Sequence, residues 1–217
     1  SVVKLNFLAQ TPLLNLPVQY VATGFSVRYN EDENISFIIT NDHFCTYADE
    51  YPDNQIFYEE SNHSFSQTTY YPAGFGVVIN TNPELDLCII VVDGFVKPVK
   101  FENKEYIVTQ TERVSTIGAP HGMFPIYNET FITGLIERDG LGLDITPNGE
   151  PIIMISQIVF PGQSGSPIFN KHDKVIGIIF ANQKKDDNSN LLSTYGGCVF
   201  SHRDIINYLE SINLMNL

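Results

Sequence analysis

The sequence is poor in cysteine, and this shortage excludes a small domain held together by several disulfides. Its three cysteines are Cys45, Cys88 and Cys198. They cannot all pair within one chain, and their spacing matches no disulfide framework. We therefore expect unpaired, buried thiols, which favour a reducing, cytoplasmic compartment.

Basic residues and long apolar runs are scarce as well. Lysine and arginine number 12 against 25 aspartates and glutamates, which gives a formal charge of −13. Such a charge repels nucleic acids and anionic membrane surfaces, so we expect neither as a partner. No apolar run approaches the ~20 residues that span a bilayer, and the first residues do not resemble a signal peptide. We expect a soluble chain without a targeting or transmembrane segment.

The apolar residues that are present fall in short runs between turns. With 217 residues, 43% of them hydrophobic, the chain can form one large all-β domain or two small lobes. Alternating short runs bounded by glycine, proline and acidic residues predict strands. The end of the chain differs, because a capping box at 201–204 precedes apolar residues with helical spacing. We expect an amphipathic helix over 202–214.

One loop has the composition needed to present a reactive serine. In the segment from Phe160 to Phe169, Gly162 and Gly165 flank Ser164 and permit backbone conformations that other residues avoid. The N–H groups of Gly162 and Ser164 can point into one small space, where a developing oxyanion would be held. Ser166 is the alternative nucleophile, but the flanking glycines favour Ser164.

A serine nucleophile needs a base and a group that orients the base. His43 follows an apolar strand at 38–40, and Asp86 stands within the apolar run 85–92. A carboxylate in such a run is costly to bury without a partner, and an imidazole N–H is the partner that a catalytic triad supplies. The predicted triad is therefore His43, Asp86 and Ser164.

Other titratable residues are weaker candidates. Asp42 adjoins His43, but neighbouring strand residues point to opposite faces, and Asp93 falls in a turn. His121 lies in a turn near another motif and is expected to be a surface histidine. The remaining histidines are expected to have no catalytic role: His63, His172 and His202. The acidic segment 47–64 matches no calcium loop, so we interpret it as solvated and predict no metal site.

Five motifs resemble those of the trypsin-like serine peptidases of chymotrypsin fold. The resemblance is greatest to the branch with the high-temperature-requirement proteases and the staphylococcal glutamyl endopeptidase, and it covers nearly the whole chain. In chain order the motifs are Thr40-Asn41-Asp42-His43, Leu85-Asp86-Leu87, Ile117-Gly118-Ala119-Pro120-His121-Gly122, Gly162-Gln163-Ser164-Gly165-Ser166-Pro167 and Val175-Ile176-Gly177-Ile178. This sequence departs from the family at Gln163, usually Asn or Asp, and at Cys88, commonly Ala.

The resemblance implies a single peptidase domain over 1–217. Its fold would be all-β, with two six-stranded β-barrel lobes of chymotrypsin type, about 1–100 and 101–200, followed by the C-terminal α-helix. The implied activity is that of a serine endopeptidase that forms an acyl-enzyme with a protein or peptide substrate. Such an enzyme needs no cofactor. The oligomeric state stays open.

The same resemblance suggests which residues contact substrate. It places Ile158 and Ile179 near the primary pocket, and Phe180, Ala181 and Asn182 on an edge that pairs with substrate backbone. Because none of these is charged, we expect a small or medium apolar residue before the cleaved bond. A preference for Lys or Arg is disfavoured, whereas a preference for Glu stays open.

Two alternatives to an active protease are considered. The first is a catalytically silent module of the same fold that binds peptides or assembles with a partner. The second is a latent protease whose loops 137–151 and 183–193 order only when a partner or substrate binds. Activation by a newly cut amino terminus is not supported, since the chain begins Ser-Val-Val.

Overall fold

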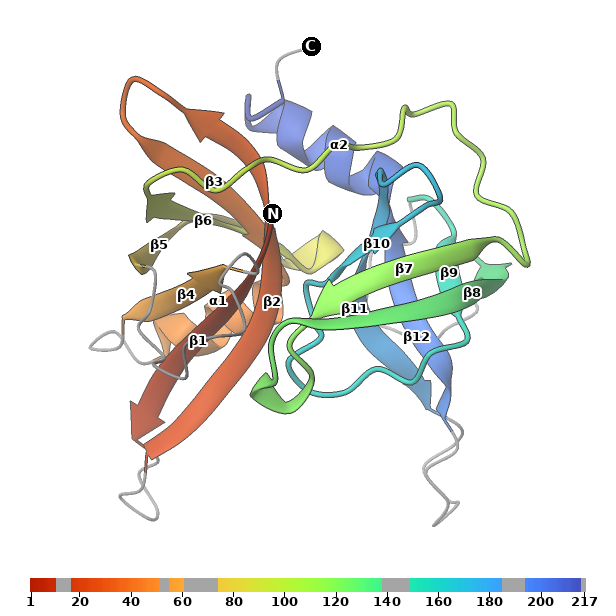
Figure 1. The fold of residues 1–217 in the computed structure, drawn as a ribbon, viewed down its shortest axis with the longest axis horizontal. Helices are drawn as coiled ribbons and strands as arrows, with labels where there is room; N and C mark the ends of the chain where they lie inside the picture. The colour runs from red at the N-terminus through yellow and green to blue at the C-terminus, as the bar shows by residue number, and fades with distance from the viewer. Residues whose placement is uncertain (11–16, 51–54, 61–73, 138–148, 185–193, 216–217) are drawn as a thin grey trace.

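Two closed antiparallel β-barrels lie side by side, and helix α2 (His202–Ser211) lies at the top of the view in Figure 1, between the β2–β3 hairpin and the second barrel. This computed structural model describes residues 1–10, 17–50, 55–60, 74–137, 149–184 and 194–215. The strand orders are β1-β2-β3-β6-β5-β4 and β10-β11-β12-β9-β8-β7. The predicted fold class, two six-stranded barrels followed by a C-terminal helix, is confirmed.

The first barrel holds the strands β1 (Val2–Gln10), β2 (Pro17–Asn30), β3 (Ile35–Thr40), β4 (Ile56–Glu60), β5 (Gly74–Asn82) and β6 (Leu87–Asp93). The second holds β7 (Arg113–Gly118), β8 (Ile126–Ile136), β9 (Ile152–Ile155), β10 (Pro167–Phe169), β11 (Val175–Lys184) and β12 (Thr194–Ser201). Two short 3₁₀ turns, η1 (Pro83–Leu85) and η2 (Pro120–Gly122), join strands within the barrels.

Each barrel has an apolar interior, and a third cluster joins the barrels to α2 (His202–Ser211). Phe25 and Leu87 of the first barrel, Phe180 of the second and Leu209 of α2 belong to this shared cluster. Burial of apolar surface is the main stabilising term in folding. The barrels and the helix are therefore held as one unit.

Helix α2 is shorter than expected. Ser201 caps it by accepting a hydrogen bond from the Arg203 N–H, as the capping signal predicted. The helix ends at Ser211 and not at Leu214, because Asn213 takes a left-handed conformation with φ of 58°. Among the described residues, no helix is long and apolar enough to cross a membrane.

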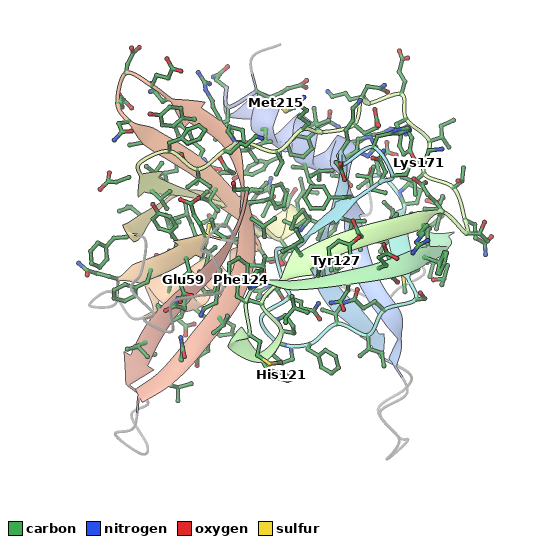
Figure 2. The ribbon with its side chains drawn as sticks, viewed as in Figure 1. Glu59, His121, Phe124, Tyr127, Lys171 and Met215 are labelled. Carbon is green, nitrogen blue, oxygen red and sulfur yellow. A yellow bond between two sulfur atoms is a disulfide. The ribbon has the colours of Figure 1, made fainter. Side chains whose placement is uncertain are left out.

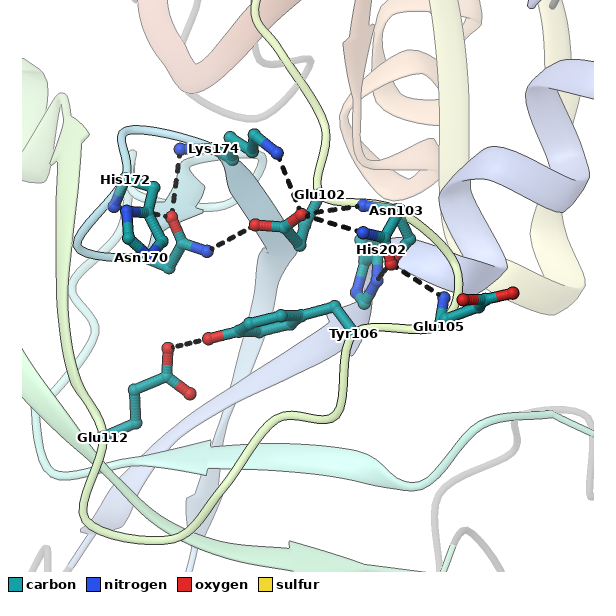
Figure 3. Close-up of polar contacts among 9 residues, drawn as sticks. All are labelled: Glu102, Asn103, Glu105, Tyr106, Glu112, Asn170, His172, Lys174 and His202. Atoms are coloured by element: carbon teal, nitrogen blue, oxygen red, sulfur yellow. Dashed lines mark hydrogen bonds and ion pairs between the residues drawn. The ribbon is translucent and has the colours of Figure 1, made fainter.

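A buried carboxylate ties the linker between the barrels to the second barrel (Figure 3). Glu102 is 5% exposed, and its carboxylate accepts hydrogen bonds from Lys174 at 3.0 Å and from the Asn170 side chain at 3.0 Å. The Asn103 N–H donates to it at 3.1 Å. Burial raises the pKa of Glu102, but these donors outweigh that effect and lower the pKa to about 2.

The same network reaches the start of α2. The His202 ring lies 2.9 Å, through Nε2, from the Asn103 carbonyl oxygen (Figure 3), and the residue is 1% exposed. Burial lowers the pKa of His202, so the ring is held neutral and donates to this carbonyl. The linker and the helix are thereby fixed to each other.

The expectation of three unpaired thiols is wrong. Cys45 and Cys88 form a disulfide, and both are fully buried. Cys198 is free and buried, and burial raises the pKa of its thiol to about 11. The disulfide links α1 (Asp42–Asp49) to β6.

Helix α1 was also missed, because the apolar run before it predicted a strand that ends at His43. Strand β3 ends at Thr40, Asn41 occupies the N-cap position without a side-chain capping bond, and His43 lies in the first turn of the helix. The argument that Asp42 and His43 point to opposite faces of a strand therefore does not apply. The acidic segment 47–64 is not one solvated loop either, since it contains the end of α1 and strand β4.

Candidate active site

His43 and Asp86 lie beside each other and share three contacts. The imidazole Nδ1 lies 2.9 Å from Asp86 Oδ2 and 3.1 Å from Oδ1, and the His43 backbone N–H donates to Oδ1 at 2.9 Å. With an Nδ1–H donating to the carboxylate, Nε2 keeps its lone pair and can accept a proton. The side chains are 42% and 19% exposed, so the pair is open to a reactant.

Asp86 is positioned by a turn and not by a strand. It follows the 3₁₀ turn η1, has φ of 49°, and precedes β6, which begins at Leu87. Aspartate is one of the few residues that tolerate this left-handed conformation. The Asn41 side chain donates to the Asp86 carbonyl oxygen at 2.9 Å. This contact ties the turn to the segment that leads into His43.

The loop around Ser164 is held by its own backbone. The Gln163 N–H donates to the Phe160 carbonyl at 3.0 Å, and the Gln163 side-chain oxygen accepts from the Phe160 N–H at 2.8 Å. The Gly165 and Ser166 N–H groups also donate to carbonyls, at 2.8 and 3.0 Å. The Gly162 and Ser164 N–H groups donate to no other residue that the structure describes. These two donors are available to a ligand.

Two glycines allow this loop to approach its neighbours. Gly162 has φ of 94°, and a Cβ there would lie 2.2 Å from the Ala119 carbonyl oxygen. Gly165 has φ of 85°, and its Cβ would lie 1.9 Å from the Thr23 carbonyl oxygen. Both the conformation and the space exclude a side chain at these positions.

The loop is also attached to the first barrel, close to His43. The Thr23 N–H of β2 donates to the Ser164 carbonyl oxygen at 2.8 Å, and the Thr23 hydroxyl donates to the Gly162 carbonyl oxygen at 2.7 Å. The Thr40 hydroxyl, three residues before His43, donates to the Thr23 carbonyl oxygen at 2.7 Å. These contacts bring the main chain of Ser164 to the strand end that leads into His43.

The alternative nucleophile and acids are placed less favourably. Ser166 is fully buried, whereas Ser164 is partly exposed. The Asp42 carboxylate accepts from the Thr46 hydroxyl at 3.3 Å, and burial raises its pKa. Asp93 is exposed at the end of β6.

The other histidines are separate from this group. His121 is exposed in η2, between the lower parts of the two barrels in Figure 2, with its ring 5.2 Å from the Phe160 ring. His202 belongs to the Glu102 network, His172 lies in the turn after β10, and His63 lies outside the described residues. Within the described ranges, no group of three or more His, Cys, Asp or Glu residues could hold a metal ion.

The two isoleucines expected near the primary pocket lie in different environments. Ile158 is 48% exposed and lines a hollow of about 640 Å³ together with Gln163. Ile179 is fully buried in the core of the second barrel. Its N–H donates to the Ser166 carbonyl at 2.9 Å and its carbonyl accepts from Gly165 at 2.8 Å. Ile179 therefore contacts the serine loop through its main chain.

The residues expected to pair with substrate backbone lie where β11 extends beyond its neighbour β10. They are Phe180, Ala181 and Asn182. Strand β10 pairs with β11 only as far as Ile178, whereas β12 accompanies β11 to its last residue. Past the serine loop, one edge of β11 thus has no strand partner among the described residues. Phe180 itself is only 8% exposed and stacks on Phe200.

Sequence reasoning missed three features of the site. The first is Thr23, which lies outside the five motifs. The second is the contact from Asn41, which no local pattern marks. The third is the Cys45–Cys88 disulfide, for which a signal existed, since each cysteine lies two residues after a predicted triad member. The loops 137–151 and 183–193 lie largely outside the described residues.

Similarity to known proteins agrees with this geometry. A family model described as a trypsin-like peptidase domain matches residues 22–178. A "Probable periplasmic serine endoprotease DegP-like" of Pseudomonas putida is 29% identical over 163 residues, which is 74% of this chain and 29% of that protein. The protein of the same name from Pseudomonas fluorescens is 27% identical over 160 residues, again 74% and 29%. The chain spans less than a third of these relatives.

Solved structures of an "HtrA-type protease AlgW with tripeptide" have the same fold. One has a TM-score of 0.67 and 17% identity, and the match covers 96% of this chain and 59% of that one. A variant form of that protease has a TM-score of 0.69 and 17% identity, with 97% and 59% covered. At this identity the likeness is one of fold alone.

The expectation of a reducing, cytoplasmic compartment is wrong. It rested on three unpaired thiols, but Cys45 and Cys88 form a disulfide. Disulfides persist in oxidising compartments and are rare in the cytosol. The relatives are named as periplasmic proteins, which agrees with the disulfide and not with our expectation.

Proposed function

Since this chain belongs to the trypsin-like peptidase domain family, we propose that it is a serine endopeptidase with the triad His43, Asp86 and Ser164. The observation that carries this proposal is the hydrogen-bonded pair of His43 and Asp86. The attachment of the Ser164 loop to Thr23 supports it further. We also treat residues 1–217 as one peptidase domain, because one apolar cluster joins both barrels and α2.

In this mechanism the Ser164 hydroxyl oxygen attacks the scissile carbonyl carbon. His43 Nε2 takes the hydroxyl proton and later gives it to the leaving amine, so the peptide C–N bond breaks and an acyl-enzyme forms. A water molecule, deprotonated by the same nitrogen, then releases the acyl group and restores Ser164. Asp86 holds the imidazole in the required tautomer and stabilises the imidazolium.

The Gly162 and Ser164 N–H groups would stabilise the oxyanion of the tetrahedral intermediate. They are the two donors of the loop without a partner in the described part of the chain. A donor directed at such a developing charge contributes about 3 kcal/mol to the barrier reduction. The family usually has Asn or Asp at the position of Gln163. Here the Gln163 side-chain oxygen accepts a hydrogen bond from the Phe160 N–H and so fixes the turn beside these donors.

We propose that an extended peptide binds along the open edge of β11, at Phe180, Ala181 and Asn182. Peptides commonly bind as an added strand at such an edge. The residue before the cleaved bond is proposed to be small or medium and apolar, since the half-exposed, uncharged Ile158 lines the hollow beside Gln163. Cleavage of a peptide library, read by mass spectrometry, tests this preference; predominant cleavage after Lys, Arg or Glu would contradict it.

We further propose that the protein works in an oxidising compartment such as the periplasm. The buried Cys45–Cys88 disulfide supports this, as do the names of the relatives.

Labelling by a fluorophosphonate tests the nucleophile. We expect the wild-type protein to be labelled and to cleave peptides, and Ser164→Ala to do neither while it remains folded by circular dichroism. Ser166→Ala is the matched control and should still be labelled, because Ser166 is buried. Labelling that survives in Ser164→Ala would contradict the assignment. A folded wild-type protein that is never labelled would favour the catalytically silent peptide-binding module.

A further inference from the structure

Thr23 connects the two barrels at the serine loop through both its hydroxyl and its main chain. Its hydroxyl donates to the Gly162 carbonyl oxygen at 2.7 Å and accepts from the Ala119 N–H at 3.0 Å. Its N–H donates to the Ser164 carbonyl oxygen at 2.8 Å, and its carbonyl accepts from the Thr40 hydroxyl at 2.7 Å. Thr23 is fully buried, so water does not compete for these bonds.

These bonds determine which way the peptide groups of the loop point. In a trans peptide the C=O and the N–H lie on opposite sides, so holding one fixes the direction of the other. The Gly162 and Ser164 carbonyl oxygens are held by Thr23, and the Pro161 carbonyl oxygen accepts from the His121 N–H at 2.7 Å. The two carbonyl groups held by Thr23 share their peptide groups with the Gln163 and Gly165 N–H groups, on both sides of Ser164, and the Pro161 carbonyl shares its peptide group with the Gly162 N–H. Loss of the Thr23 bonds would free the peptide groups around Ser164 to rotate and would shift its hydroxyl.

Thr23 also links this loop to the base. Thr40 is the last residue of β3 and lies three residues before His43. Its hydroxyl donates a hydrogen bond to the Thr23 carbonyl oxygen. One buried residue is therefore hydrogen-bonded to the loop of the nucleophile and to the segment that leads into the base. A shift of about 1 Å between reacting groups can reduce the rate by about 100-fold.

We propose that Thr23 is a positioning residue that holds the Ser164 loop in register with His43, through its buried hydroxyl on the side of the loop and through its carbonyl oxygen on the side of Thr40. This inference rests on the proposed peptidase function. Thr23 does not touch the reacting atoms, so its loss should impair the chemical step and leave substrate binding along β11 intact.

The test compares Thr23→Val, which keeps the shape and removes the hydroxyl, with Thr23→Ser, which keeps the hydroxyl. We expect Thr23→Val to lower kcat about 10- to 100-fold with KM within about twofold, and to slow fluorophosphonate labelling in parallel. Thr23→Ser should restore kcat to within about threefold of wild type. Thr130→Val is the matched control, since it removes another buried threonine hydroxyl, bonded to Ser156 at 2.9 Å, and should leave kcat unchanged.

The inference is overturned if Thr23→Val keeps wild-type kcat, or if Thr23→Ser loses as much as Thr23→Val. If Thr23→Val does not fold, kcat and KM are measured for Thr40→Val in its place, because this variant removes only the hydrogen bond to the Thr23 carbonyl oxygen. An unchanged kcat in Thr40→Val would then overturn the inference, and a loss of about fivefold or more with KM unchanged would support it. A wild-type protein that neither cleaves nor labels would refute the peptidase function itself, which distinguishes the two failures.

Discussion

Gly165 shows how a single missing side chain lets the serine loop lie against the first barrel. Its N–H binds the Ile179 carbonyl in the second barrel, while its Cα faces the Thr23 carbonyl and the Thr40 hydroxyl in the first. The unusual backbone conformations of Gly162 and Gly165 could be predicted from the sequence, because glycine adopts them readily and other residues do not, whereas the role of Ser164 stays a prediction. The left-handed backbone of Asp86 could not, since it depends on the turn η1 and on Asn41, 45 residues away.

Gly165→Ala should abolish activity and destabilise the protein. The added Cβ would lie 1.9 Å from the Thr23 carbonyl oxygen and 2.4 Å from the Thr40 hydroxyl, at φ of 85°. We expect a loss of at least about 2 kcal/mol in the free energy of unfolding, measured with urea, and at least about 100-fold in kcat.

Gly134→Ala is the control for this change. It lies in β8 with nothing within 4 Å of its added Cβ, and it should change stability by less than about 1 kcal/mol. Equal effects of the two substitutions would contradict the close approach at Gly165.

At the scale of elements, strands were easier to predict than the short helix. Apolar runs bounded by turn residues predicted strands, and the runs at 38–40 and 85–92 overlap β3 and β6. Helix α1 was missed because it has only eight residues and a single residue, Asn41, separates it from β3. The disulfide was missed because pairing depends on α1 lying against β6, a contact between segments far apart in sequence.

Removal of the disulfide should destabilise the elements that carry the base and the acid. Cys45→Ala with Cys88→Ala releases a cross-link over 43 residues. We expect a loss of about 2–4 kcal/mol in the free energy of unfolding, measured with urea. Cys198→Ala is the control and should leave the cross-link intact.

Thiol counting checks the pairing directly. In denaturant without reductant, the wild-type protein should show one reactive thiol, Cys198, and after reduction it should show all three. Three reactive thiols before reduction would contradict the disulfide.

At the scale of the whole molecule, the linker and α2 bind the barrels into one body. The order of two barrels and a final helix could be predicted from motifs spread along the chain. The Glu102 network could not, because it joins the linker, the turn between β10 and β11, and the start of α2, and none of these segments has a pattern that marks its partners.

Glu102→Gln should weaken the molecule in a pH-dependent way. The folded-state pKa of Glu102 is about 2 against an ordinary value of 4.5, so its stabilising effect is present above about pH 4.5 and is lost as the pH falls toward 2. At pH 7 we expect the variant to be less stable by about 1–3 kcal/mol, and the difference should shrink below pH 4.5.

Urea titrations at pH 7, 4.5 and 3 measure this difference. Glu129→Gln is the control, because Glu129 and its partner Arg113 are exposed on the surface and such pairs contribute little. A variant with wild-type stability at every pH would contradict the role of the Glu102 network.

The division of the proposed triad between the barrels has a consequence for biosynthesis. His43 and Asp86 come from the first barrel and Ser164 from the second, and the cluster that joins the barrels includes residues of α2, near the end of the described chain. In the proposed mechanism, the base and the acid are therefore synthesised before the nucleophile. The active site would be complete only after both barrels and α2 have come together.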